Sequence, residues 1–350
     1  MFAQAGLCII GTLPEPRNAQ LERALPILSF SVPVTVDTTM CGFCPAPRRC
    51  PDDSKKEDGC LFHPLTESDL PQLWERQQRL HALSSEFDAF RLFAWLPLDQ
   101  TEVMYWRDQY ALRFRMQGQA WYLAPYEAED FPALLEALAA HERTCGGTVL
   151  RFLNVERPLS AFPAGFTAIP RRDLHDYLYR AEDLICMKGR AFAAKRNLIS
   201  QFKRRYDWHF EPLSVHNHAD CLRVLKAWDE GHEGSPLIAF ERSAIERMLT
   251  YPEAHGQSGG LLYADGAPIA FAIGSHPRPA LLDIVAEKAL PAYVGSYAMM
   301  VQTYAEYAHS LAPFTWINRE EDMGLENLRN AKQQLNPACL IEKTLMELPL

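Results

Sequence analysis

The stretch LLYADGAPIAFAIG, residues 261–274, decides the fold of the chain. Two apolar runs flank Asp265-Gly266, and a dipeptide of this kind favours a type I′ turn, so the stretch predicts a β-hairpin. The run LLDIVAEKA at 281–289 predicts a third strand directly after the hairpin. Three successive strands therefore begin the C-terminal region.

Helices and strands alternate after these three strands. Apolar residues recur with a helical period at 295–311 and 325–335, whereas FTWINRE at 314–320 and CLIEKTLMEL at 339–348 have the composition of strands. The predicted order is β-β-β-α-β-α-β. It is similar to the order of the GNAT acyltransferase core.

The upstream region has the pattern of another mixed domain. Residues 65–83 and 131–144 predict helices, and 102–125 predict successive strands. Prolines and glycine interrupt this pattern at 161–176, which is typical of a boundary. We therefore expect an α+β chain divided into an N-terminal segment, a first domain and a second domain, over residues 1–62, 63–172 and 173–350.

Composition limits the class of protein. The chain has 350 residues with a net charge of −9, 48% hydrophobic residues and 23% charged residues, which is typical of a globular protein. The acidic balance argues against a protein that coats nucleic acid. No apolar run approaches the ~18 residues that span a bilayer, and the first residues lack a basic segment. We expect a cytoplasmic protein with at most peripheral membrane contact.

A cysteine cluster marks the N-terminal segment: its members are Cys41, Cys44, Cys50 and Cys60. A Cys-x2-Cys pair can chelate one metal ion from a tight turn, so these residues are candidate ligands for zinc. An iron–sulfur cluster also uses four thiolates. Free thiols or a regulatory disulfide are the alternatives.

The basic stretch KGRAFAAKRNLISQFKRRY, residues 188–206, predicts a helix with one apolar stripe. Arg190, Arg204 and Arg205 point away from the stripe and predict a solvated face. Lys195 falls inside the stripe, where an unpaired ammonium is costly. It must therefore meet an acid in a structural ion pair, bind an anionic ligand or reach water.

The C-terminal helix repeats this feature, because Lys332 lies within its apolar arc and Arg329 lies beside the arc. Inward cations on two helices suit a phosphate or carboxylate. In the preceding strand, alternation places Asn318 and Glu320 on one face, and Asp322 is expected to cap the next helix. A purely structural interpretation, with Glu320 in an ion pair, remains open.

Several of these stretches together resemble the phosphatidylglycerol lysyltransferase C-terminal domain family. The resemblance implies two tandem GNAT-like (acyl-CoA N-acyltransferase-like) domains, the first degenerate, and a relation to the Fem group of aminoacyl-tRNA-dependent transferases. It also implies a stand-alone member without the membrane domain of the lipid branch. The matching pieces are SEFDAFRLFAW (85–95), DYLYRAEDLICMKGRAFAAKRNLISQFKRRY (176–206), AWDE (227–230), PIAFAIG (268–274), AEKA (286–289) and INREEDMGLENLRNAKQQLNP (317–337).

The resemblance also assigns site residues. A carboxylate would accept the proton of the attacking acceptor, and the cations would hold the phosphates of the donor. The implied catalytic residues are Glu320, Asp322 and Lys332. The implied donor-binding residues are Lys188, Lys195, Arg196, Asn197, Glu287, Lys288, Asn318 and Arg329.

The expected function is transfer of an aminoacyl group from the acceptor end of charged tRNA to an amine or hydroxyl of a small molecule, a peptide or a lipid headgroup. Acyl-CoA is the alternative donor. GNAT domains bind its pyrophosphate with a glycine-rich loop, whereas residues 288–300 here contain only Gly295-Ser296. A non-catalytic, metal-containing RNA-binding or regulatory module is the third hypothesis.

Overall fold

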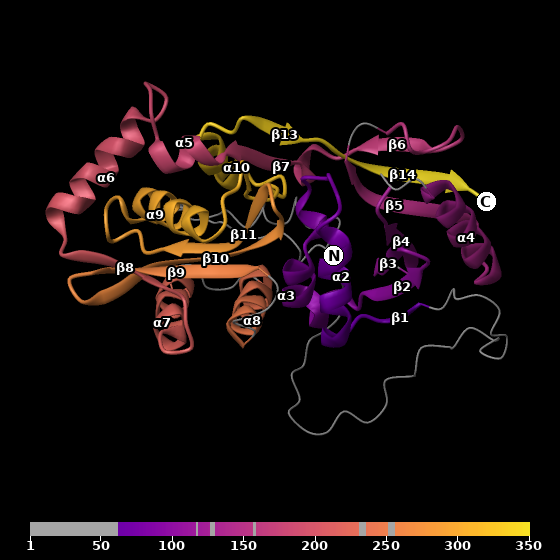
Figure 1. Ribbon diagram of the computed structural model, residues 1–350, viewed down its shortest axis with the longest axis horizontal. Helices are drawn as coiled ribbons and strands as arrows, with labels where there is room; N and C mark the ends of the chain where they lie inside the picture. Colours follow the sequence, from indigo (N-terminus) through magenta and orange to yellow (C-terminus); the bar gives the residue numbers. More distant parts are fainter. Residues whose placement is uncertain (1–61, 117, 127–129, 157–158, 231–235, 251–255) are drawn as a thin grey trace.

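The structure is a computed structural model that describes residues 62–350 except 117, 127–129, 157–158, 231–235 and 251–255 (Figure 1). Two mixed β-sheets lie side by side along the long axis, each with helices packed against it. The predicted α+β class is confirmed. Within the described residues, no helix is long and apolar enough to cross a membrane. The cysteine cluster falls outside the described part of the chain.

Sheet A contains strands β1 to β6 and the C-terminal strand β14, in the order β1-β2-β3-β4-β5-β14-β6. Its apolar side chains and those of its helices form one core, to which α4 contributes Leu134, Leu135 and Leu138. The helix α3 begins where the Asp88 carboxylate accepts a hydrogen bond from the Phe90 backbone N–H. The elements are β1 (His63–Pro64), η3 (Glu67–Asp69), α2 (Leu70–Gln77), η4 (Ser85–Phe87), α3 (Ala89–Asp99), β2 (Glu102–Trp106), β3 (Gln109–Met116), β4 (Gln119–Leu123), α4 (Phe131–Thr144), β5 (Val149–Glu156) and β6 (Thr167–Pro170).

Sheet B has the order β13-β7-β12-β11-β10-β9-β8. Helix α9 covers one face of it, while α7 and α8 lie on the other side (Figure 1). The elements are η5 (Arg172–Leu174), β7 (Asp176–Arg180), α5 (Ala181–Cys186), α6 (Ala193–Arg205), β8 (Trp208–Pro212), α7 (His218–Asp229), α8 (Pro236–Thr250), β9 (Gln257–Ala264), β10 (Ala267–Arg278), β11 (Leu281–Ala289), α9 (Ser296–Leu311), β12 (Trp316–Asn318), α10 (Glu326–Gln333), β13 (Cys339–Ile341) and β14 (Lys343–Pro349).

The hairpin that opens the β-β-β-α-β-α-β order is confirmed. Strands β9 and β10 pair around Asp265 and Gly266, whose φ angles of +52° and +78° suit a type I′ turn. The predicted order then continues through β11, α9, β12, α10 and β13. The helix predicted over 188–206 is shorter, because α6 begins only at Ala193, after Gly189 with φ +83°.

The strand predicted over 339–348 is divided between the two sheets. β13 pairs with β7 in sheet B, whereas β14 pairs with β5 and β6 in sheet A. The prediction of one closing strand is therefore wrong. Glu342 separates the two pieces, and Lys343 at the start of β14 is buried between the sheets beside Glu86 and Asp176.

Strands β11 and β12 part at a fork. Their parallel pairing runs from Leu281 opposite Trp316 to Asp283 opposite Asn318, and β11 then continues to Ala289 paired with β10 on its other edge. The chain leaves β12 after Asn318 and turns into the loop that leads to α10. We call the point beyond Asp283 and Asn318 the fork. The loop that carries Glu320 begins there.

A cluster of buried charged side chains joins the two sheets beside the fork. It links α3 in the first half of the chain with β7, β11 and the loop after β12. The C-terminal strand β14 contributes Lys343 to it. This buried charge cluster consists of Glu86, Asp88, Arg91, Asp176, Arg278, Asp283, Glu320, Glu321 and Lys343.

Removing one cation from this cluster will destabilise the protein strongly. Lys343 is 0% exposed and lies 2.6 Å from the Asp176 carboxylate and 3.0 Å from the Glu86 carboxylate. Lys343→Met leaves these carboxylates without their cation, so we expect the free energy of unfolding to fall by about 3–5 kcal/mol in urea titrations. Lys188→Met, which removes an exposed pair, should cost less than about 1 kcal/mol. Equal losses for the two variants would contradict the structure.

Candidate active site

The loop after β12 holds Glu320 in an unusual backbone conformation. Glu320 has a φ of +56°, which residues other than glycine rarely adopt. Its N–H donates to the Asn318 side-chain oxygen at 2.7 Å, and its carbonyl accepts from the Tyr177 N–H at 3.1 Å. Backbone strain of this kind persists only where surrounding contacts fix it, and it is frequent at functional sites.

Lys332 supports the same loop from α10. Its ammonium group is buried and donates to the backbone carbonyls of Arg319 and Glu321, the residues on either side of Glu320. It also lies over the Tyr177 ring, 5.8 Å from the centroid. The inward position predicted for Lys332 is therefore observed. Its observed contacts position the loop.

The Glu320 carboxyl group is buried between α3 and the fork. Its Oε1 accepts a hydrogen bond from Arg91 Nε at 2.7 Å, and its Oε2 has no hydrogen-bond partner within the described residues. Burial raises the pKa of Glu320 to about 8, while the charge of Arg91 acts in the opposite direction. A carboxyl group with this pKa can both accept and return a proton near neutral pH.

Asp283 is a second buried carboxyl group at the fork. It is 0% exposed, and neither carboxylate oxygen has a hydrogen-bond partner within the part of the chain that the structure describes. Burial raises the pKa of Asp283 well above its usual range, and the negative charges of Glu320 and Asp88 act in the same direction. The surroundings of Asp283 therefore disfavour its ionised form, whereas Glu320 has Arg91 as a direct partner.

Asp322 is held in a different way. Its carboxylate accepts hydrogen bonds from Tyr177 Oη at 2.7 Å, from Arg329 Nε at 2.8 Å and from Arg172 Nη1 at 3.1 Å. Burial acts to raise the pKa of Asp322, but the hydrogen bonds from Arg329 and Tyr177 lower it overall. Asp322 is therefore an ionised clamp between η5, β7 and α10.

The predicted capping role of Asp322 is wrong. Helix α10 begins at Glu326 with Leu325 as its N-cap, and that cap has no side-chain hydrogen bond. Asp322 lies too early in the chain to reach the first amides of the helix. Its carboxylate instead accepts from the Gly324 N–H at 2.8 Å, which stabilises the turn before α10.

A group of polar side chains lies on the α9 side of the fork. Arg319 donates to the Glu287 carboxylate and to Tyr297 Oη, each at 2.5 Å. Lys195 on α6 donates to the side-chain oxygen of Gln334 at 3.3 Å and has no ion-pair partner within the described residues. Burial lowers the pKa of Lys195, and the positive charge of Arg319 lowers it further. Arg319 is already paired with Glu287, so Lys195, which bonds to a neutral side chain, is the cation that suits an anion on this side of the fork.

Four of the predicted donor-binding residues have other surroundings. Lys288 is buried against Trp228 on the opposite face of sheet B and forms an ion pair with Glu241 at 2.8 Å. Arg196 donates to backbone carbonyls just after α5, and Lys188 pairs with Glu182 on the surface at 3.7 Å. Asn197 is exposed on α6. The structure does not bring these residues to the fork.

Sequence reasoning missed several members of the site. Arg91, Asp283 and Arg319 were not singled out, although each is buried at the fork. A signal existed for Arg91, because it interrupts the apolar run AFRLFAW at 89–95 of α3. A cation in such a run needs a buried acid. One partner, Glu86, lies five residues upstream, but the other, Glu320, is 229 residues away and could not be identified from the pattern.

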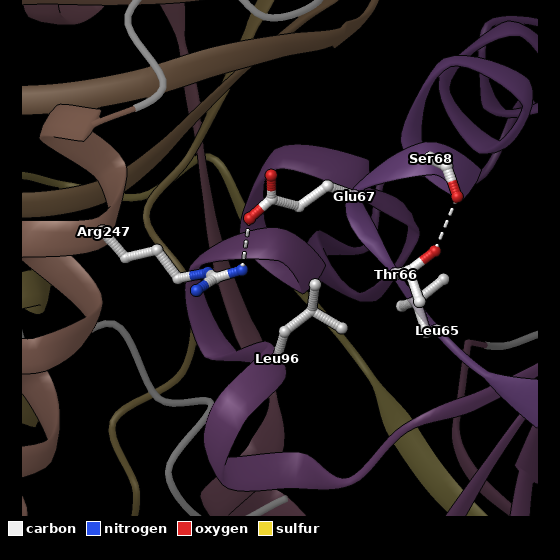
Figure 2. A pocket seen from close by; sticks show the side chains of 6 residues that line it. All are labelled: Leu65, Thr66, Glu67, Ser68, Leu96 and Arg247. Atoms are coloured by element: carbon white, nitrogen blue, oxygen red, sulfur yellow. Dashed lines mark hydrogen bonds and ion pairs between the residues drawn. The ribbon is translucent and has the colours of Figure 1, made fainter.

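The structure also contains a pocket of about 480 Å³ between η3, α3 and α8. Figure 2 shows Arg247 reaching from α8 to the Glu67 carboxylate, at 2.9 Å, across one side of it. None of its lining residues is a predicted site residue. The predicted metal ligands lie outside the described residues, in which no group of three His, Cys, Asp or Glu side chains could hold a metal ion.

Comparison with known proteins identifies the family of the chain. A sequence model for the family described as "Phosphatidylglycerol lysyltransferase, C-terminal" matches residues 91–345, which include Arg91 and Glu320. No curated protein matches the sequence.

Three solved structures resemble the chain. A conserved protein of unknown function from Bacteroides thetaiotaomicron is 25% identical, with a TM-score of 0.76 over 83% of this chain and 99% of that one. L-PGS from Bacillus licheniformis is 16% identical, with a TM-score of 0.58 over 84% and 94%. FemX is 10% identical, with a TM-score of 0.58 over 83% and 97%. The last two likenesses concern the fold.

The raised pKa of Glu320 predicts how stability depends on pH. The native state binds this proton more tightly than the unfolded chain, so the free energy of unfolding should fall as pH rises from about 4.5 to about 8. Glu320→Gln cannot ionise and should lose less stability between pH 6 and pH 9 than the wild type.

Urea titrations at the two pH values measure this difference. We expect it to exceed about 1 kcal/mol, because one pKa unit corresponds to about 1.4 kcal/mol. The exposed control Glu326→Gln should follow the wild type. If Glu320→Gln follows the wild type as well, Glu320 does not have the raised pKa.

Proposed function

The chain belongs to the phosphatidylglycerol lysyltransferase C-terminal family, and from this we propose that it transfers an aminoacyl group from aminoacyl-tRNA to an amine or hydroxyl acceptor. Family membership makes the protein a transferase of the acyl-transfer class. The finer assignment of donor and acceptor rests on the chemistry of the fork.

The observation that carries the proposal is the parting of β11 and β12 between two chemically different surfaces. Glu320, with its unpartnered Oε2, lies on the side facing α3, whereas Lys195 and Arg319 lie on the side facing α6 and α9. A donor with an anionic body and a reactive ester needs both a cationic contact and a proton acceptor. Glu320 would supply the proton acceptor, and Lys195 would supply the cationic contact.

The reaction can be written with these groups. The acceptor nitrogen or oxygen attacks the ester carbonyl, and its proton passes to Glu320 Oε2, directly or through one water molecule. Lys195 and Arg319 offset the negative charge that develops on the donor. The bond between the aminoacyl carbonyl carbon and the ribose oxygen of the tRNA then breaks. Glu320 returns the proton to this leaving oxygen. No proton is gained or lost overall.

Arg91 has a positioning role in this scheme. It binds Oε1 of Glu320 and leaves Oε2 for the proton. It also lowers the pKa of Glu320 against the effect of burial, so that the carboxylate form is accessible near neutral pH. Without this cation, Glu320 would hold its proton too tightly to act as a base.

Acyl-CoA is the less favoured donor. GNAT enzymes bind its pyrophosphate at the N-terminus of the helix that corresponds to α9. Here Gly295 precedes α9 with φ +90°, and a Cβ at this position would lie 2.6 Å from the Leu198 carbonyl oxygen and 3.1 Å from Phe202 Cβ. Helix α6 therefore packs closely against the start of α9. This packing, together with the missing glycine-rich loop, supports a different anionic donor.

A transfer assay tests the proposal. Purified protein is given tRNA charged with labelled amino acids, with a lipid extract or, separately, with small molecules and peptides as acceptors. We expect label to move into one fraction, and Glu320→Gln to slow this by about a hundredfold or more, as is typical of a lost acid–base group. Glu326→Gln should retain full activity. Transfer from acyl-CoA alone would contradict the proposal.

The pH dependence of kcat/KM gives a second test. The acting form of Glu320 is the carboxylate, so the rate should rise with pH and level off above about 8. Arg91→Gln removes the cation that lowers this pKa and should move the midpoint to higher pH. Arg91→Lys keeps the charge and should leave the midpoint near that of the wild type. An unchanged midpoint in Arg91→Gln would exclude Glu320 as the titrating group.

A further inference from the structure

A row of cations on α6 and on the loop before it faces the solvent. Residues 184–206 contain no Asp or Glu, in a chain with a net charge of −9. The row therefore has the opposite sign to the chain as a whole. Its exposed members are Lys188, Arg190, Arg196, Lys203, Arg204 and Arg205.

Neighbouring carboxylates do not neutralise most of this row. Within the described residues, the side chains of Arg190 and Arg204 have no hydrogen-bond or ion-pair partner. Lys203 and Arg205 lie over the rings of Trp208 and Tyr206, at 5.5 Å and 5.3 Å. Lys188 has a carboxylate close by in a weak and exposed pair with Glu182, and the charge of Lys203 acts on Glu306 of α9. The charges therefore remain available to an external anion.

Stabilisation of the helix does not account for the row. Cations in the last turn, such as Arg204 and Arg205, interact favourably with the helix dipole. The N-terminal end of α6 instead carries Arg190, Lys195 and Arg196, although the dipole favours acids there. The first turn of α6 contains no acidic residue. The charge therefore serves something other than helix stability.

The row leads away from the fork. Lys195 lies near the start of α6, where burial and the positive charge of Arg319 lower its pKa. Its side chain donates a hydrogen bond to Gln334, at the end of α10. From Lys195, α6 extends by about 15 Å, at 1.5 Å per residue, to the edge of the molecule (Figure 1). A polyanion whose reactive end lies at the fork would thus meet cations at both ends of α6, with residues 197–202 between them.

The chemistry of the row fits a nucleic-acid backbone better than a membrane. A helix that binds a membrane surface presents large apolar side chains beside its cations. The apolar residues of α6, Ile199 and Phe202, are instead buried against sheet B. No residue of α6 is among the exposed large apolar side chains of the described residues. Exposed arginine and lysine side chains are typical contacts of phosphates.

We infer that α6 and the loop at 188–192 bind the phosphate backbone of the tRNA acceptor arm while its aminoacylated end lies at the fork. This inference rests on the proposed function and adds to it the surface that recognises the donor. Shape and phosphate contacts dominate recognition of double-stranded RNA, so the row needs no base contacts.

Charge removal at matched positions tests the inference. The variant Arg190→Gln/Arg204→Gln/Arg205→Gln is compared with Arg79→Gln/Arg115→Gln/Arg143→Gln, which removes the same charge from exposed positions on the sheet A half. For the α6 variant we expect the Kd for uncharged tRNA and the KM for aminoacyl-tRNA to rise about tenfold or more. The slope of log K against log salt should become shallower by about two, since each phosphate contact contributes about 0.7–0.9. The control variant should stay within twofold of the wild type.

A minimal donor separates this inference from the proposed function. An aminoacylated CCA trinucleotide reaches the fork without contacting most of α6, so the α6 variant should use it within twofold of the wild-type rate. Equal use of aminoacyl-tRNA by all three proteins would overturn the inference and leave the proposed function standing. Loss of binding to phosphatidylglycerol vesicles, with tRNA binding unchanged, would assign the row to lipid and overturn it as well.

The remaining outcome concerns the proposed function itself. If the wild type uses neither aminoacyl-tRNA nor the trinucleotide, the proposed function fails. The binding of uncharged tRNA then decides the inference alone. Binding that is weak and identical in all three proteins would overturn it.

Discussion

A buried guanidinium group that must be neutralised is the constraint on which the site depends. Arg91 is 1% exposed and lies in an apolar helix, where an unpaired cation would be prohibitively costly. Its partners Glu86 and Glu320 come from opposite halves of the chain. The need to satisfy this one charge fixes α3 of sheet A against the loop at the fork of sheet B. The geometry of the site is therefore a property of both halves.

The same cluster contains more acids than bases, and the excess determines its chemistry. Its three cations, Arg91, Arg278 and Lys343, face six carboxyl groups. Burial opposes ionisation of Glu86 and Asp176, but Lys343 lowers the pKa of both. Burial raises the pKa of the remaining four, which disfavours their ionised forms around the fork. Those four are Asp88, Asp283, Glu320 and Glu321.

Local patterns in the sequence were sufficient for the order of elements in sheet B. The hairpin at Asp265-Gly266 depends on neighbouring residues only. The strand predicted over 314–320 is shorter, because β12 ends at Asn318 and Glu320 lies in the loop beyond it with φ +56°. The inward position of Lys332 also followed from helix periodicity, although its partners are backbone carbonyls and could not be inferred from composition. The division of the last strand depends on Lys343 meeting carboxylates far away in the chain. Pairing over such separations leaves no periodic signal.

The most direct measurement of the site is a crystal structure with a donor analogue whose ester is replaced by an amide, such as CCA carrying an amide-linked aminoacyl group. The expected result is the analogue at the fork, with its phosphates beside Lys195 and Arg319 and its carbonyl group on the side of Glu320 Oε2. Binding in the pocket between η3 and α8, with nothing bound between β11 and β12, would contradict the assignment of the fork as the donor site.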